Sequence, residues 1–290
     1  MRQLIKKLLL FPLEILNIIV LAYTFLLGLI NSNLKYVWIQ RQVEVNNNRS
    51  QEVTHSTSIG KNEQLNFFVP NWLCKYRADT FSSKEPETLK WIDDYGDDGV
   101  LFDIGANIGL YSIYYAKTKN NNVYAFEPSF FNLPLLAKNI NSNNLQDKIH
   151  IITNPLSDTI QFADFNLSSM DEGHALSAFG VNFDQYGDQL QKVFSYKTSG
   201  YPLDFLLAQK ILPEIPKMIK IDVDGIEHLV LSGAKETLKN QKCKTVLIEI
   251  NDMFKEQFNK TESILTECNF TLKEKHRTAG DTYNQIWHKD

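Results

Sequence analysis

Residues 100–112 read VLFDIGANIGLYS, and this stretch decides the fold. Apolar residues run into Asp103, and the turn that follows contains two glycines, Gly105 and Gly109. A glycine has no Cβ, so the backbone of such a turn can bend sharply and approach a ligand closely. Asn107, between the two glycines, tolerates unusual backbone angles. A buried strand, a glycine turn and a following helix predict a site for a nucleotide-type cofactor.

Outward from this turn, apolar runs alternate with helical stretches. The predicted strands are 100–103, 122–126, 148–153, 218–223 and 245–250, the helices are 110–119, 132–141 and 227–240, and 270–274 with 282–288 form a closing hairpin. This alternation predicts an α/β fold, in which helices cover both faces of a mainly parallel sheet. Ligands of such sheets bind beyond the carboxyl ends of the strands. The rule points to residues 103–109, 127–128 and 222–225.

The turn departs from both phosphate-binding motifs. A P-loop requires a lysine that is missing here. The dinucleotide motif requires a glycine where this chain has Asn107. Asp103 precedes the turn and would repel a pyrophosphate, but it suits a cofactor with positive charge, such as S-adenosylmethionine. Glu127, at the end of the second strand in YAFEP, is placed to accept hydrogen bonds from two ribose hydroxyls.

Two further stretches complete the pattern. IKIDVDGIEHLVLSGAKETL (219–238) and VLIEI (246–250), together with FDIGANIG and AFEP, resemble the FkbM-type methyltransferases over about residues 80–275. The resemblance implies a class I Rossmann-like fold with a seven-stranded sheet, and O-methylation from S-adenosylmethionine, commonly on sugars, glycans or secondary metabolites. It also implies a set of cofactor contacts, at Asp103, Gly105, Asn107, Gly109, Glu127 and Asp158, the last as the adenine-edge residue.

Methyl transfer requires an oxygen aligned opposite the leaving sulfur, and a base that takes the hydroxyl proton assists it. Asp222, at a strand tip, is the favoured catalytic or substrate-positioning carboxylate. Asp224 stands where the family often has glutamate, because D-x-E-G is replaced by D-x-D-G. His228 suits either a base or a capping histidine. Lys220 suits either a catalytic role or an ion pair with a neighbouring acid.

Composition excludes several other classes of protein. The net charge of −4 is unlike the basic footprint of a nucleic-acid binder, so no nucleic-acid partner is expected. The three cysteines form no C-x-x-C pair, which disfavours a disulfide framework or a zinc site. The run D-x-D-G-x-E-H does not match the spacing of a calcium loop, so no metal is expected.

The N-terminus holds an apolar run at residues 8–30, long enough to cross a bilayer as a helix. A signal peptide is disfavoured, because the run is long and no small-residue cleavage site follows. A packing helix of a soluble protein stays open as an alternative. Within the run, Glu14, Asn17, Thr24 and Gly28 fall on one stripe of small or polar residues, which Leu21 interrupts. Such a stripe suits close packing against a partner helix.

These patterns divide the chain into a membrane-associated helix at 1–31, a polar linker or peripheral strand pair at 32–65, and a methyltransferase domain at 66–290. Residues 159–200 interrupt the alternation and are expected to form a substrate-side insertion, where His174 could contact the acceptor. S-adenosylmethionine is kept inside cells, so the catalytic domain is expected to face the cytoplasm. Two rivals stay open: an NAD-dependent sugar oxidoreductase and an inactive, membrane-tethered binding protein.

Overall fold

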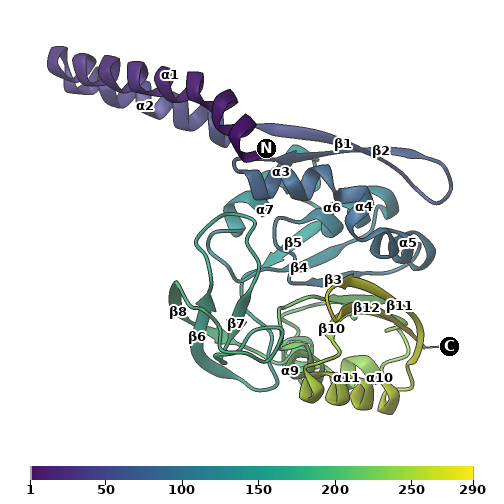
Figure 1. The fold of residues 1–290 in the computed structure, drawn as a ribbon. Helices are drawn as coiled ribbons and strands as arrows, with labels where there is room; N and C mark the ends of the chain where they lie inside the picture. The colour runs from purple at the N-terminus through teal and green to yellow at the C-terminus, as the bar shows by residue number, and fades with distance from the viewer. Residues whose placement is uncertain (1, 290) are drawn as a thin grey trace. The chain divides into compact units, whose positions relative to one another are not determined.

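The computed structural model describes residues 2–289, with side chains from residue 10 onward. The chain divides into two compact units, residues 1–49 and 50–290. The first unit consists of helices α1 (Arg2–Ile30) and α2 (Ser32–Asn47) (Figure 1). Asn31 separates them with extended backbone, and its side chain accepts a hydrogen bond from the Asn33 amide. This cap starts α2, because it satisfies an amide that lacks an intrahelical partner.

From Leu10 onward, helix α1 exposes most of its apolar side chains, and its segment Leu10–Ile30 is long and apolar enough to cross a membrane. A signal sequence or the core helix of a soluble protein meets the same criterion. The small-residue stripe meets α2 at its C-terminal end, where a Cβ built on Gly28 would lie 3.2 Å from Cδ of Lys35. Glu14 and Asn17, at the other end of the stripe, are exposed.

The second unit is built on a seven-stranded sheet with the order β11–β12–β10–β9–β3–β4–β5. Its strands are β3 (Leu101–Ile104), β4 (Val123–Phe126), β5 (Ile149–Ile152), β9 (Met218–Ile221), β10 (Thr245–Asn251), β11 (Thr271–Ala279) and β12 (Thr282–His288). The first five of these run parallel to one another, whereas β12 is antiparallel to β10 and β11 is antiparallel to β12. The prediction of a class I Rossmann-like methyltransferase fold is confirmed.

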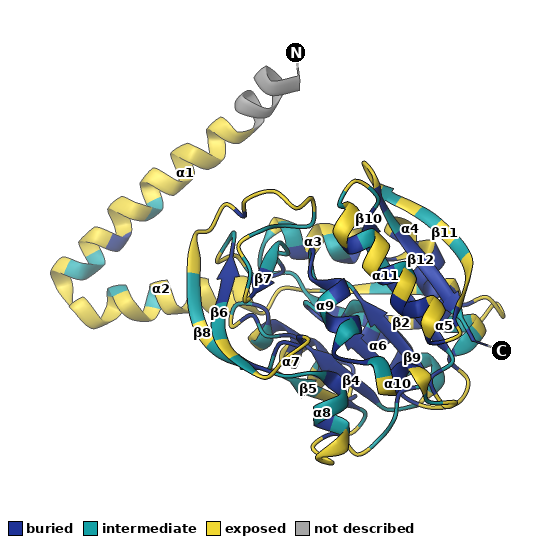
Figure 2. Cartoon of the chain, turned by 90° about the horizontal axis from the view of Figure 1, so that it is seen from below, coloured by how far each residue is buried: buried dark blue, intermediate teal, exposed yellow. Residues whose placement is uncertain are grey.

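Side chains alternate between the two faces of each strand, and two hydrophobic clusters follow from this alternation. Phe102 and Ile104 belong to one cluster, and Leu101 belongs to the other. The first is covered by α8 (Leu203–Ala208), α9 (Glu227–Ser232), α10 (Lys235–Lys239) and α11 (Lys255–Glu267), and the second by α5 (Pro86–Tyr95), α6 (Leu110–Lys119) and α7 (Leu133–Ser142). Figure 2 shows the buried sheet between these helices.

The predicted helix 227–240 is divided into α9 and α10 at Gly233. A Cβ at Gly233 would lie 2.1 Å from the carbonyl oxygen of Ser157, so the backbone passes directly against the loop after β5. Only glycine permits so close an approach.

Residues 32–65, expected as a linker or a peripheral strand pair, hold a helix and most of an antiparallel strand pair. Helix α2 occupies much of this range, and β1 (Ser50–Ser56) pairs with β2 (Asn62–Phe68) as an antiparallel hairpin. Leu65 and Phe67 of β2 are fully buried in the cluster on the α6 face of the sheet. The compact domain therefore begins at residue 50, and α3 (Trp72–Asp79) and α4 (Phe81–Lys84) lead from the hairpin to α5.

The insertion at 159–200 has a sheet of its own. Strands β6 (Gln161–Leu167), β7 (Ser177–Phe179) and β8 (Phe194–Gly200) form an antiparallel sheet in the order β7–β6–β8. Phe165 and Phe179 pack with Ile226, which precedes α9. The insertion is thereby anchored next to the carboxyl end of β9.

Candidate cofactor and acceptor site

The turn between β3 and α6 lies against the end of β9. Gly105 has a φ of +88°, and a Cβ there would lie 1.9 Å from the carbonyl oxygen of Asp222. Gly109 also has a φ of +88°, and a Cβ there would lie 2.5 Å from Cδ1 of Leu136. Asn107, between them, adopts a left-handed conformation with a φ of 51°. The two glycines therefore let the turn lie against β9 and α7.

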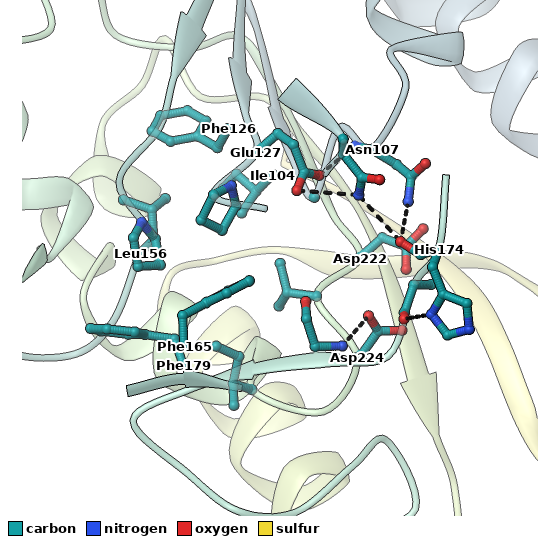
Figure 3. Close-up of a pocket in the computed structure, with 18 of the residues that line it drawn as sticks. Ile104, Asn107, Phe126, Glu127, Leu156, Phe165, His174, Phe179, Asp222 and Asp224 are labelled. Carbon is teal, nitrogen blue, oxygen red and sulfur yellow. Dashed lines mark hydrogen bonds between the residues drawn. The ribbon is translucent and has the colours of Figure 1, made fainter. Parts of the chain in front are cut away.

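Glu127 connects the end of β4 to this turn, as Figure 3 shows. One carboxylate oxygen accepts a hydrogen bond from the Asn107 amide at 2.7 Å, and the other accepts one from the Ser129 amide at 2.8 Å. Burial raises the pKa of Glu127 to about 7. The side chain nevertheless faces a cavity, so a ligand can reach its oxygens.

This main cavity has a volume of about 710 Å³, part of it open to solvent, and its two sides differ in polarity. The apolar side is lined by Ile104, Phe126, Leu156, Phe165, Phe179 and Ile226, and the polar side by Gly105, Asn107, Glu127, Asn132, Asp222 and Asp224. An apolar slot beside a few convergent polar groups is typical of a small-molecule site. Here the slot suits a purine, and the carboxylate beside it suits a ribose.

Part of the insertion, residues 172–177, crosses this cavity and is held on both sides. The side-chain amides of Asn107 and Asn132 donate to the carbonyl oxygen of His174 at 3.0 and 3.2 Å. Arg77 of α3 donates to the carbonyl oxygen of Gly173 at 2.8 Å. On the opposite side, Asp224 accepts hydrogen bonds from the amides of residues 176 and 177, at 2.7 and 3.2 Å. His174 contributes its backbone here, and Asp224 positions the segment.

Lys220 and Asp222 form an ion pair at the end of β9. Lys220 is 2% exposed, and its Nζ lies 2.8 Å from Oδ2 of Asp222. Burial alone would raise the pKa of Asp222, but the positive charge of Lys220 outweighs this effect and holds the pKa below its usual value. Lys220 also lies over the ring of Tyr111, 5.2 Å from the centroid. Lys220 is thus a structural partner of Asp222, the second of the alternatives that the sequence leaves open.

Asp222 also lines two further cavities, of about 490 and 800 Å³, and Arg77 lines both of them with it. Most of the residues that line the larger one have polar side chains, among them Asp224, Glu249, Thr278 and Gln185. Hereafter we call it the polar cavity. Because Asp222, Asp224 and Arg77 also line the main cavity, the two spaces adjoin.

Asp103 is not among the residues that line these cavities. It is 1% exposed, and its Oδ2 accepts a hydrogen bond from Ser112 of α6 at 2.6 Å. Its Oδ1 is buried without a hydrogen-bond partner among the described residues. The alternation along β3 explains this position, since Ile104 faces the main cavity and Asp103 faces α6. Burial raises the pKa of Asp103. A direct contact of its carboxylate with the cofactor is therefore not favoured by this geometry.

Two other predicted residues lie outside the cavities. Asp158 is exposed and accepts a hydrogen bond from the Ser157 hydroxyl at 3.2 Å, whereas Leu156, two residues earlier, forms the cavity wall. His228 is buried in α9, with its ring 6.1 Å from that of Phe254, and burial lowers its pKa. Leu156 rather than Asp158 thus lines the apolar side of the cavity, and His228 packs against Phe254.

The residues that sequence reasoning did not find come from distant segments. Arg77 lies on α3, and Asn132 precedes α7. Glu227, by contrast, is the glutamate of the run D-x-D-G-x-E-H, and it caps the turn after β9 by accepting hydrogen bonds from the amides of Val223 and Gly225 at 3.1 and 3.0 Å. Glu249 carried a recognisable signal, because it is the one charged residue of the apolar stretch VLIEI, in the strand that pairs with β9.

Comparison with known proteins identifies the family. The family model described as "Methyltransferase FkbM domain" matches residues 103–272, more than half of the chain. The chain belongs to the FkbM methyltransferase family. S-adenosylmethionine is therefore its methyl donor.

Several solved structures are similar to the chain at low sequence identity. The FkbM methyltransferase from Methylobacillus flagellatus KT is 18% identical with a TM-score of 0.47, over 66% of this chain and 44% of that one. TrmK from M. capricolum, in complex with S-adenosylhomocysteine, is 16% identical with a TM-score of 0.41, over 70% and 68% of the two chains. TYW2 from M. jannaschii, in complex with AdoMet, is 12% identical with a TM-score of 0.41, over 83% and 88%. No curated protein matches the chain.

The main cavity fits this methyl donor. At Gly105 the backbone itself lines the cavity. No side chain is tolerated there, because a Cβ would collide with the carbonyl oxygen of Asp222. Glu127 faces the space beside the apolar slot and can accept hydrogen bonds from hydroxyls. Asp222, whose pKa Lys220 holds low, places a carboxylate on the same wall, which favours a cation over a phosphate.

Proposed function

We propose that the protein transfers a methyl group from S-adenosylmethionine to a hydroxyl oxygen of a sugar, a glycan or a related metabolite. The observation that supports this acceptor class is the polar cavity beside the main one. Carboxylate, hydroxyl, amide and guanidinium groups line it, and a molecule with many hydroxyls can satisfy groups of all these kinds.

The bound cofactor supplies a methyl group on a positively charged sulfur. Glu127 would accept hydrogen bonds from the ribose hydroxyls, and Leu156 with Phe126 would contact the purine. The turn from Gly105 to Gly109, with Asn107, would contact the rest of the molecule. Asp222 stays ionised beside Lys220, so it can orient an acceptor hydroxyl by accepting a hydrogen bond.

Two other functions compete with this proposal. An NAD-dependent oxidoreductase is disfavoured, because Asn107 replaces the middle glycine of the dinucleotide motif and because acids line the cavity where a pyrophosphate would bind. A catalytically inactive binding protein is disfavoured by the polar cavity, which a simple cofactor-binding protein does not need.

A labelling experiment tests the proposal. The full chain, in detergent micelles, is incubated with S-adenosyl-[methyl-³H]methionine and a mixture of monosaccharide methyl glycosides. We expect label in an alkali-stable ether, and a rate lower on the order of 100-fold for Asp222→Asn. Alkali-labile label would indicate a carboxyl ester instead. Binding of NAD without binding of S-adenosylhomocysteine, measured by titration calorimetry, would overturn the assignment.

We also propose that α1 attaches the protein to a membrane, with the catalytic domain in the cytoplasm. The length and composition of Leu10–Ile30 support the attachment, and the intracellular methyl donor supports the orientation. Protease added to intact cells should leave the catalytic domain uncut, and it should cut that domain after the cells are permeabilised. Cleavage in intact cells would contradict the orientation.

A further inference from the structure

Glu249 lies beside Asp222 at the carboxyl end of the sheet. Strands β9 and β10 are parallel, and Ile221 pairs with Ile248, so the next residues of both strands are neighbours. Adjacent strands are about 4.8 Å apart, and paired residues point to the same face. Leu247 packs on the α6 face of the sheet, two residues before Glu249. Glu249 therefore shares with Lys220 and Asp222 the face that opens into the polar cavity.

The hairpin β11–β12 completes the surroundings of this carboxyl. The Thr278 hydroxyl lies 3.1 Å from Oε1 of Glu249 and 3.2 Å from the carbonyl oxygen of Thr282. A hydroxyl has one hydrogen, so it can donate to only one of these oxygens at a time. Thr278 can donate to Glu249 when the carboxyl is ionised. It can donate to the carbonyl of Thr282, and accept from Glu249, when the carboxyl is protonated.

The two neighbouring carboxyls have opposite environments. Asp222 has Lys220 as an ion-pair partner and stays ionised. Burial and the negative charges of Asp222 and Glu85 raise the pKa of Glu249 well above its usual value, and Lys220 opposes this only partly. The charged groups that act on Glu249 are Asp222 and Lys220 of β9, Asp224 of the following turn, and Glu85 before α5. Two cations, Arg77 of α3 and Lys84 of α4, line the same cavity. When their environments move the pKa values of two neighbouring carboxyl groups apart, the two groups can take different acid and base roles.

We propose that Glu249 is the general base of methyl transfer, taking the proton of the acceptor hydroxyl in the polar cavity while Asp222 orients that hydroxyl. This inference rests on the proposed function. The acceptor oxygen forms its bond to the methyl carbon as the carbon–sulfur bond breaks. The electron pair of that bond stays on sulfur, and the hydroxyl proton moves to an oxygen of Glu249. Charge balances, because one cation and one carboxylate become two neutral groups.

A consequence of this assignment can be measured without an acceptor. Burial and the neighbouring carboxylates raise the pKa of Glu249, so the free protein favours its protonated form more than a solvated glutamate does. A positive charge bound in the main cavity, beside Asp222 and Asp224, favours the ionised form of Glu249. Binding of S-adenosylmethionine therefore releases a proton that makes Glu249 ready to act as a base. S-adenosylhomocysteine has a neutral thioether, so its binding releases fewer protons.

Titration calorimetry of the full chain in detergent micelles tests this inference. The binding enthalpy of S-adenosylmethionine is measured near neutral pH in phosphate and in Tris, whose ionisation enthalpies differ, and the difference gives the protons released. Glu249→Gln should release fewer protons than the wild type and bind S-adenosylhomocysteine with unchanged affinity. Glu267→Gln, an exposed carboxylate of α11, is the matched control and should behave as the wild type. The pKa values of Asp224 and Glu127 are both raised to about 7. The protons that these two groups release are expected to be equal in all three proteins, so they do not affect the comparison.

A second variant keeps the test decisive if Glu249→Gln fails to fold. Thr278→Val removes the donor that stabilises ionised Glu249, so the proton release should move to higher pH. Equal proton release by the wild type and Glu249→Gln, or an unshifted pH dependence in Thr278→Val, would overturn the role of Glu249. Failure of the wild type to bind S-adenosylmethionine at all would instead overturn the proposed function, which separates the two failures.

Discussion

Replacing Gly105 by alanine should destabilise the domain far more than the same change at another glycine with similar backbone angles. The added Cβ at Gly105 would lie 1.9 Å from the carbonyl oxygen of Asp222, and φ there is +88°. Gly60 has a φ of +79°, and nothing lies within 4 Å of its Cβ position. Gly60→Ala therefore isolates the backbone strain, at about 1–2 kcal/mol. Gly105→Ala adds the collision, which costs about 1–3 kcal/mol more as the turn moves away from β9.

The assay is urea unfolding of both full-length variants, followed by tryptophan fluorescence, with titration of S-adenosylhomocysteine as a second readout. We expect Gly105→Ala to lower the free energy of unfolding by about 2–5 kcal/mol and to weaken binding, because the same turn forms the cavity. Gly60→Ala should leave binding unchanged. Equal destabilisation by the two variants would refute the close approach of the turn to β9.

Two other predictions concern the pH dependence of stability and the apolar slot of the main cavity. Burial raises the pKa of Glu227 from 4.5 to about 7, so the folded protein keeps this proton longer than the unfolded chain and loses stability as pH rises through that window. Glu227→Gln should flatten this decline in urea midpoints measured between about pH 5 and pH 8, and an unchanged slope would contradict the assignment. Leu156→Ala should weaken binding of S-adenosylhomocysteine on the order of 10-fold through lost apolar contact. Asp158→Ala should leave this affinity unchanged. A larger loss of affinity in Asp158→Ala than in Leu156→Ala would instead support Asp158 as the adenine contact.

The central sheet was predictable because its strands are buried and bounded by turn residues. Helix α6 occupies residues 110–119 as predicted, since Gly109 starts it and Asn120 ends it in left-handed conformations that few other residues adopt. Helix α2 was not predictable. Its 16 residues have no buried side chain in the structure, so the sequence there has no apolar periodicity for a pattern to detect.

Some residues of the site could likewise be predicted from the sequence, and others could not. Glu127 and Asp222 were found because they end parallel strands, and the ends of such strands meet in space. Asp103 obeys the same rule, yet it faces α6, because the side to which a strand residue points depends on a register that the sequence does not display. Arg77 reaches the cavity from α3 through a bond to Gly173, 96 residues further along the chain. No local pattern encodes such a contact.

The account depends most directly on Glu127 as the ribose-binding carboxylate of the main cavity. The measurement that tests it is the affinity of S-adenosylhomocysteine for the wild type, for Glu127→Gln and for the exposed control Glu236→Gln, by titration calorimetry of folded protein. Loss of charge-assisted hydrogen bonds should weaken binding to Glu127→Gln by about 10- to 100-fold and leave the control unchanged. Undiminished affinity in Glu127→Gln would contradict the account.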